Sequence, residues 1–243
     1  MFLLLAAAAI GSFLATCVSR AARQVSVFGA VRSSCPTCGA IVPAYALLPI
    51  LGFLVLRGRC GDCGARIDPL HPMMEAATVA MCVSALWVAG WLLTLEAACG
   101  LALGTALVFL ASHDARTGRL PDVVTLPLIV AGLAVSAWLE RVDFSESALG
   151  VILGGAGGWA VSAAYRQLRG REGLGMGDVK LVAGLGAWLG AGALPGLLLV
   201  ASASALAVLF VRAVSGRRIS RHARIVFGPF LALAGWVLWL AGA

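Results

Sequence analysis

Charge is scarce in this chain: only 12% of its 243 residues are charged, whereas 61% are hydrophobic. A soluble domain carries about 25% charged and about 45–50% apolar residues. This shortage excludes an ordinary soluble domain. It also argues against nucleic-acid binding, which needs a solvated basic face, despite the net charge of +7. The basic residues lie instead in gaps between apolar runs, as in a membrane protein.

The first ten residues also lack a basic residue, so the N-terminus does not have the charged start of a secretory signal peptide. The apolar stretch continues to Val18, which favours a retained first transmembrane span. Further apolar runs follow along the chain, and together the runs cover residues 2–19, 73–95, 97–112, 123–139, 147–165, 176–193, 195–211 and 225–242. They predict an all-α fold, a polytopic membrane bundle of about eight transmembrane helices.

Alternating these spans predicts the orientation. With residues 20–72 in the cytoplasm, every Lys and Arg except Arg141 falls in a cytoplasmic loop, including a basic cluster at 217–224. This is the positive-inside pattern of a membrane protein with several spans. The apolar run 40–56 contains two prolines, and we interpret it as a loop on the membrane surface. We therefore expect a first span at 1–19, a small cytoplasmic loop domain at 20–72 and a membrane core at 73–243.

Four of the seven cysteines form two CxxC pairs, Cys35/Cys38 and Cys60/Cys63. Two such pairs in one short segment are typical of a structural zinc site with four cysteine ligands. Disulfides are disfavoured in the reducing cytoplasm. A closed four-cysteine site leaves no open position for catalysis, so we expect the metal to stabilise the loop domain only.

Two aspartates at the ends of apolar runs are candidates for chemistry, because charge beside a span is costly and usually functional. Asp114 ends the third run, and Asp178 begins the sixth within Gly175-Met-Gly177-Asp-Val-Lys180. The predicted topology puts both at the cytoplasmic side. Two carboxyl groups that share one proton can activate a water molecule and polarise a peptide carbonyl. The two glycines allow close approach of backbone or substrate.

A structural interpretation of these acids competes with the catalytic one. Interfacial aspartates often pair with nearby cations, here Arg116, Arg119 or Lys180. Asp122, which follows Leu120-Pro121, is the acid most similar to Asp114 in its setting. We expect Asp122 to cap the N-terminus of the fourth span.

Taken together, the motifs resemble those of the prepilin peptidases, or type IV leader peptidases. The resemblance covers nearly the whole chain and rests on five motifs in order: Gly11-Ser-Phe13 with Arg20, the two CxxC pairs around Leu56-Arg-Gly-Arg59, Asp114 with Leu120-Pro-Asp122, Gly175-Met-Gly-Asp-Val-Lys180, and Phe227-Gly-Pro-Phe230.

The resemblance implies a GxGD-type intramembrane aspartyl endopeptidase of the bacterial inner membrane. Such enzymes cut the short basic leader from type IV prepilins and type II secretion pseudopilins on the cytoplasmic side. Asp114 and Asp178 match the catalytic pair, and Gly175, Gly177, Lys180 and Asp122 support their motifs. Many members also N-methylate the new N-terminus with S-adenosylmethionine.

The chain departs from the family pattern at Ala15, Ala44, Leu47 and Leu70, where the family usually has polar or aromatic residues. Methyltransferase activity therefore stays open. Two other functions stay open as well: a zinc-stabilised membrane scaffold without catalysis, and a transporter, because intramembrane acids also mark ion paths. Neither the particular prepilin nor the oligomeric state follows from the sequence.

Overall fold

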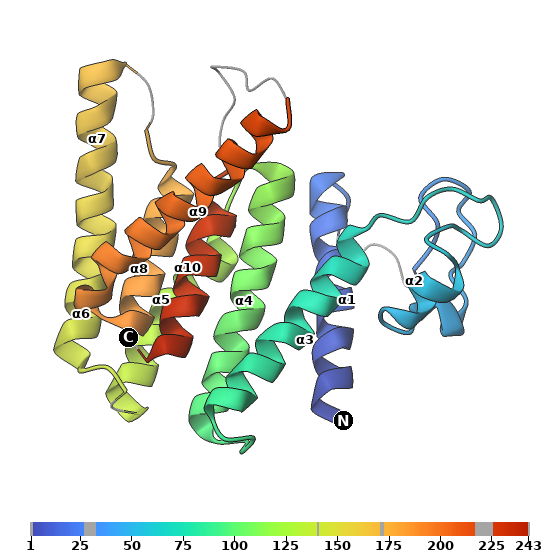
Figure 1. The fold of residues 1–243 in the computed structure, drawn as a ribbon, viewed down its shortest axis with the longest axis horizontal. Coiled ribbons are helices and arrows are strands. Elements are labelled where there is room, and N and C mark those ends of the chain that lie inside the picture. The colour runs from blue at the N-terminus through green and yellow to red at the C-terminus, as the bar shows by residue number, and fades with distance from the viewer. Residues whose placement is uncertain (1, 27–32, 140, 171–172, 217–225, 243) are drawn as a thin grey trace. The chain divides into compact units, whose positions relative to one another are not determined.

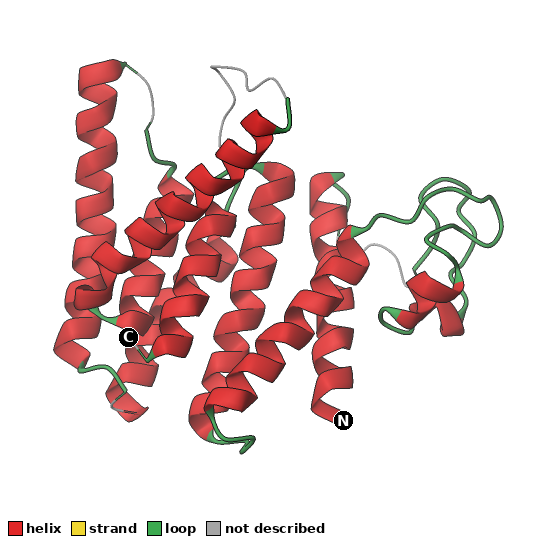
Figure 2. Cartoon of the chain, viewed as in Figure 1, coloured by secondary structure: helices red, strands yellow, loops and turns green. Residues whose placement is uncertain are grey.

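The computed structural model describes residues 2–26, 33–139, 141–170, 173–216 and 226–242. Within them the chain is helical, with loops and isolated β-bridges as the other structure (Figure 2). This confirms the predicted all-α class. The basic cluster expected at 217–224 lies outside the described residues. The chain forms two compact units, Met1–Thr117 and Gly118–Ala243, and each is described by itself.

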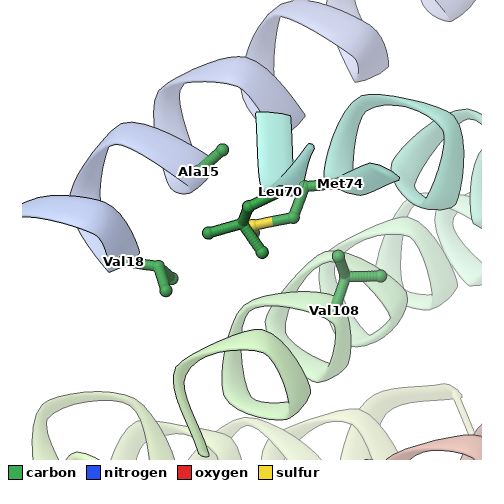
Figure 3. Packing of buried hydrophobic residues seen from close by; sticks show 5 residues of the cluster. All are labelled: Ala15, Val18, Leu70, Met74 and Val108. Carbon is green, nitrogen blue, oxygen red and sulfur yellow. The ribbon is translucent and has the colours of Figure 1, made fainter. Parts of the chain in front are cut away.

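Three long helices and a loop region with two short helices form unit 1 (Figure 1). In chain order its helices are α1 (Phe2–Ala22), the 3-10 turn η1 (Ala44–Leu47), α2 (Leu51–Val55), α3 (Leu70–Val88) and α4 (Leu95–Thr117). The side chains of Ala15, Val18, Leu70, Met74 and Val108 converge where α1, α3 and α4 pack together (Figure 3). The run 40–56 forms two short helices and not one long helix, which agrees with the helix-breaking effect expected of its two prolines.

The second apolar run ends earlier than the sequence predicted. Helix α3 stops at Val88, and Gly90 follows with φ +64°. The amide of Gly90 donates to the carbonyl of Trp87, and that of Trp91 donates to Leu86. This is the Schellman arrangement that closes a helix at a left-handed glycine. The turn separates α3 from α4, whose first turn is capped by the hydroxyl of Thr94 through the Ala97 amide.

Unit 2 is built around one buried helix. Its elements are α5 (Asp122–Leu139), α6 (Phe144–Ile152), the π-turn η2 (Leu153–Gly157), α7 (Gly158–Arg169), α8 (Met176–Leu189), the 3-10 turn η3 (Ala191–Ala193), α9 (Leu194–Val214) and α10 (Gly228–Ala241). Helix α8 contacts α5, α6, α7, α9 and α10. Every residue from Leu181 to Leu189 is buried.

Polar side chains of neighbouring helices fix α8 in place. The hydroxyl of Ser147 on α6 donates to the Ala187 carbonyl at 2.6 Å, and the indole of Trp188 donates to the Leu128 carbonyl on α5 at 2.9 Å. Gly150 and Gly186 meet at the α6–α8 crossing, where a Cβ on Gly186 would lie 2.4 Å from the Gly150 carbonyl oxygen. These contacts fix the C-terminal end of α8 against α5 and α6.

Five stretches are long and apolar enough to cross a membrane: Phe2–Ala22, Leu95–Thr117, Asp122–Leu139, Phe144–Arg169 and Ala191–Val214. The protein is therefore a multi-pass membrane protein. The stretch 181–211 is broken at Gly190, so it forms two helices, as predicted. Arg141, the single basic residue predicted on the outer side, donates to the Trp239 carbonyl and lies 4.3 Å from that indole ring. A helix C-terminus and an aromatic face both favour a cation there.

Candidate functional site

Asp178 lies in the first turn of α8, three residues after the N-cap residue Gly175. A Cβ on Gly175 would lie 3.2 Å from Oδ2 of Asp178, so the carboxylate folds back over this glycine. A Cβ on Gly177 would lie 3.0 Å from Cβ of Leu120. The two glycines thus have different structural roles. The first leaves room for the aspartate side chain, and the second lets the segment before α5 pack against α8.

An ion pair joins the same two segments. The Nζ of Lys180 lies 2.7 Å from Oδ1 and 2.8 Å from Oδ2 of Asp122. Asp122 occupies the first turn of α5, where the helix dipole favours an acid. Asp122 stands at the N-terminus of α5, but it is the first residue of the helix and not its N-cap, and its carboxylate binds Lys180. Two motifs that are far apart in the sequence are in direct contact in unit 2.

Asp114 lies in the last turn of α4 in unit 1, and only 6% of it is exposed. Its neighbour Arg116 donates to Oδ1 of Asp68 at 2.6 Å. Partial burial raises the pKa of Asp68, but the hydrogen bonds from Arg116 and the Leu70 amide outweigh burial and hold that pKa below its ordinary value. Arg116 and Lys180, two of the cations considered as partners of the candidate aspartates, thus pair with Asp68 and Asp122.

The four CxxC cysteines come together in the loop region of unit 1. Their sulfur atoms all lie within 4.8 Å of one another. The Sγ atoms of Cys35 and Cys63 are 3.8 Å apart, and those of Cys38 and Cys60 are 4.0 Å apart. A tetrahedral zinc with bonds of about 2.3 Å requires sulfur–sulfur distances of about 3.8 Å. The cluster could therefore bind a metal of this kind, and its donor set fits zinc.

Both cysteine pairs have the same backbone geometry. The Cys35 amide donates to Ala40 and the Gly39 amide donates back to Cys35; the Cys60 amide donates to Ala65 and the Gly64 amide donates back to Cys60. Both glycines have left-handed φ, +74° and +69°. Each pair is thus a hairpin knuckle that directs two thiols to a common point.

Backbone amides also act on the thiols. The amides of Cys38 and Thr37 lower the pKa of Cys35 to about 6. The amide of Ala40 lowers the pKa of Cys38, but the neighbouring thiols and some loss of solvation outweigh it and raise that pKa to about 12. Cysteine binds a metal as the thiolate, so a metal ion at this cluster would displace the thiol protons.

A further carboxylate, that of Glu75 on α3, is buried, with 4% of the residue exposed. Its Oε2 accepts a hydrogen bond from the Ile50 amide at 2.7 Å. Ile50 has φ +60°, a strained conformation for a β-branched residue. The signal was present in the sequence as a glutamate inside an apolar run. Its partner could not be inferred, because Ile50 lies in an irregular loop.

Comparison with known proteins identifies the family of this multi-pass membrane protein. Residues 5–89 match the Bacterial Peptidase A24 N-terminal domain, and residues 101–211 match the Type IV leader peptidase family. The chain belongs to this family, which confirms the resemblance found in its motifs. The comparison with solved structures gave no significant match.

Several relatives bear the name "Prepilin leader peptidase/N-methyltransferase". The protein of Burkholderia pseudomallei (strain 1026b) is 40% identical over 204 residues, which are 84% of this chain and 65% of that protein. The Neisseria gonorrhoeae protein is 38% identical over 86% of this chain and 71% of its own length. The Klebsiella pneumoniae protein is 40% identical over 84% of this chain and 91% of its own length. The chain thus spans slightly less than two thirds of the Burkholderia relative.

Proposed function

We propose that this protein is a prepilin leader peptidase in which Asp114 and Asp178 form the catalytic dyad. The observation that carries the proposal is the complete GxGD motif at the start of α8, with the Asp178 carboxylate folded over Gly175. A second, buried aspartate ends α4. Membership of the type IV leader peptidase family supports the same assignment.

The chemistry follows from two carboxyl groups that share a proton. The ionised carboxylate takes a proton from water while the water oxygen attacks the peptide carbonyl. The protonated carboxyl donates its proton to the carbonyl oxygen. When the tetrahedral intermediate collapses, the carbon–nitrogen bond breaks and the leaving amine takes up a proton. Because the two groups titrate together, no separate role is assigned to either aspartate.

Gly175, Gly177, Lys180 and Asp122 would support this site without touching the substrate. The contact of Gly177 with Leu120 and the Lys180–Asp122 ion pair tie the start of α8 to the start of α5. We propose that these two contacts hold the start of α8, and with it Asp178, against α5.

The topology proposed for this function has eight spans, with the dyad and the loop domain on the cytoplasmic side. Besides the five stretches named above, α3, α8 and α10 would cross the membrane, although α8 and α10 have only 14 residues each. The support is the positive-inside pattern of the sequence. We accordingly propose residues 1–19 as the first span, 20–72 as the cytoplasmic loop domain and 73–243 as the peptidase core.

Two cofactors belong to this proposal. Zinc would be held by Cys35, Cys38, Cys60 and Cys63 and would stabilise the loop domain. The name of the relatives also includes N-methyltransferase, and a charged cofactor needs buried polar partners. Unit 1 offers Glu75 and the hydroxyl of Ser19, which is buried without a hydrogen-bond partner among the described residues. S-adenosylmethionine would supply the methyl group for the new N-terminus, and these two buried polar groups are the candidates in unit 1 to hold it.

Cleavage of a prepilin with a short basic leader, assayed in membranes, tests the dyad. We expect Asp114→Asn and Asp178→Asn each to abolish cleavage. Asp143→Asn is a matched control, because Asp143 caps α6 through the Ser145 amide and asparagine caps equally well. Cleavage that survives both changes would refute the aspartyl mechanism. A scaffold would show no cleavage in the wild type with any prepilin or pseudopilin, and a transporter would lose ion flux instead.

A further inference from the structure

The loop region of unit 1 carries a surface that is unusually apolar. The exposed apolar side chains of η1 and α2 form what we name the η1–α2 face: Tyr45, Leu47, Leu48, Leu51, Leu54 and Val55. Their exposed fractions run from 50% for Leu47 to 67% for Val55. On α2 the exposed residues Leu51, Leu54 and Val55 follow the i, i+3, i+4 spacing of one helix face. Water is a poor solvent for such a surface.

This face is held in a defined shape. Gly52 lies so close to the carbonyl of Ala46 that no Cβ would fit between η1 and α2. The Gly52 amide donates to Leu48 at 2.8 Å, and the Leu54 amide donates to Ile50 at 3.1 Å. Pro43 and Pro49 have no amide to satisfy. Few backbone donors are therefore left over, which is what an apolar medium requires.

The position of the face follows from its attachment to α3. The Ile50 amide binds Glu75, more than one helical turn after the start of α3 at Leu70. Ile50 also lines a shallow apolar hollow along α3 with Ala76, Val79 and Trp87. Leu51, a member of the η1–α2 face, is the next residue. The exposed apolar surface of α3 thus continues directly onto the loop.

Arginines accompany this apolar surface. Arg57, Arg59 and Arg66 are all exposed, and Arg59 and Arg66 stand opposite each other in an antiparallel bridge. Like charges directly opposite in such a pair repel, so an external anion would relieve a real cost. The phosphates of anionic lipids lie at the level where an apolar surface enters the acyl region. A basic leader peptide would be repelled by the same arginines.

We propose that the η1–α2 face is inserted into the headgroup–acyl boundary of the bilayer, with Arg59 and Arg66 on anionic lipid phosphates. The loop domain is then a membrane-surface element anchored to α3 by Glu75, and not a domain suspended in water. The proposal depends on the membrane insertion of α1 and α3 and not on the catalytic dyad.

Photocrosslinking in the full-length protein tests this placement. A benzoylphenylalanine is introduced at Leu51, at Leu54 or, as a control, at the exposed Thr37 on the first cysteine knuckle. The variants are reconstituted in phosphatidylcholine nanodiscs with and without phosphatidylglycerol. We expect lipid adducts at Leu51 and Leu54 and few at Thr37. Adducts with residues 118–243, adducts with a second copy, or no lipid adducts at Leu51 and Leu54 would overturn the proposal.

The arginines are tested in the same discs. Each arginine is expected to favour docking on anionic lipid about fivefold. Arg59→Gln together with Arg66→Gln should therefore reduce the lipid adducts at Leu54 in phosphatidylglycerol discs and have little effect in pure phosphatidylcholine. An equal yield of lipid adducts at Leu54 with the wild-type arginines in both kinds of disc would overturn the assignment of Arg59 and Arg66 to anionic lipid phosphates. Unchanged elution and helical circular dichroism serve as the folding control.

Discussion

Replacing Gly186 with alanine is expected to open the α6–α8 crossing. The new Cβ would lie 2.4 Å from the Gly150 carbonyl oxygen, and a backbone atom cannot rotate away as a side chain does. Overpacking of this kind costs about 3 kcal/mol at the upper end of its usual range. Alanine returns about 1 kcal/mol through its better helix propensity. The net expectation is a loss of about 2 kcal/mol.

Gly157 provides the matched control, because it is helical and a Cβ there meets nothing within 4 Å. Gly157→Ala should be neutral or stabilising by up to about 1 kcal/mol. The two variants should therefore differ by about 2–3 kcal/mol in unfolding free energy. Unfolding in mixed micelles, followed by tryptophan fluorescence, measures this difference, because Trp188 on α8 donates to α5 only in the folded state.

The consequence for function is also specific. Since α8 carries Asp178, Gly186→Ala should lower prepilin cleavage while Gly157→Ala leaves it intact. Equal stability of Gly186→Ala and the wild type would refute the close crossing. Equal damage from both alanines would show that helix flexibility, and not contact, is what the glycines provide.

Three further outcomes are expected. Asp122→Asn and Lys180→Met should each slow cleavage while changing stability by less than about 1 kcal/mol, as for exposed ion pairs. The charge swap Asp122→Lys with Lys180→Asp should restore part of the cleavage rate. An unaffected rate in both single variants would contradict the positioning role of the ion pair. A zinc chelator or Cys38→Ser should make the loop region sensitive to protease, with bound metal measured in parallel, and full protection without metal would contradict a structural site. The pKa of Asp68 is lowered in the folded state, so its ion pair with Arg116 stabilises unit 1 at pH values above the ordinary carboxylate pKa. This stabilisation is lost as the pH falls through the lowered, folded-state pKa. The wild type should therefore lose more stability on acidification than Asp68→Asn does.

Much of the fold could be read from the sequence because lipid leaves few structural choices. A long apolar run must be helical to satisfy its own backbone, so most predicted runs correspond to helices. The errors lie at turns. The run 73–95 contains the left-handed Gly90, which closes α3 early, and hydropathy does not register backbone conformation.

The candidate site was predictable to different degrees. The cysteine cluster could be predicted, because two CxxC pairs in one short segment are typical of a tetrahedral site with four thiolate ligands. The pairing of Lys180 with Asp122 was not, because a cation beside several acids does not disclose its partner. The bond of Glu75 to Ile50 was equally hidden, since it joins a helix to an irregular loop.

The sequence by itself determined that this protein enters a membrane, that its four CxxC cysteines form one site and that its motifs are those of the leader peptidases. These properties depend on composition and on short spacings, which survive without three-dimensional information. Only the tertiary structure shows why a side chain is not accommodated at the two glycine positions of the GxGD motif. Gly175 makes room for Asp178 and Gly177 for Leu120, and such contacts depend on how the start of α8 packs against its own aspartate and the segment before α5.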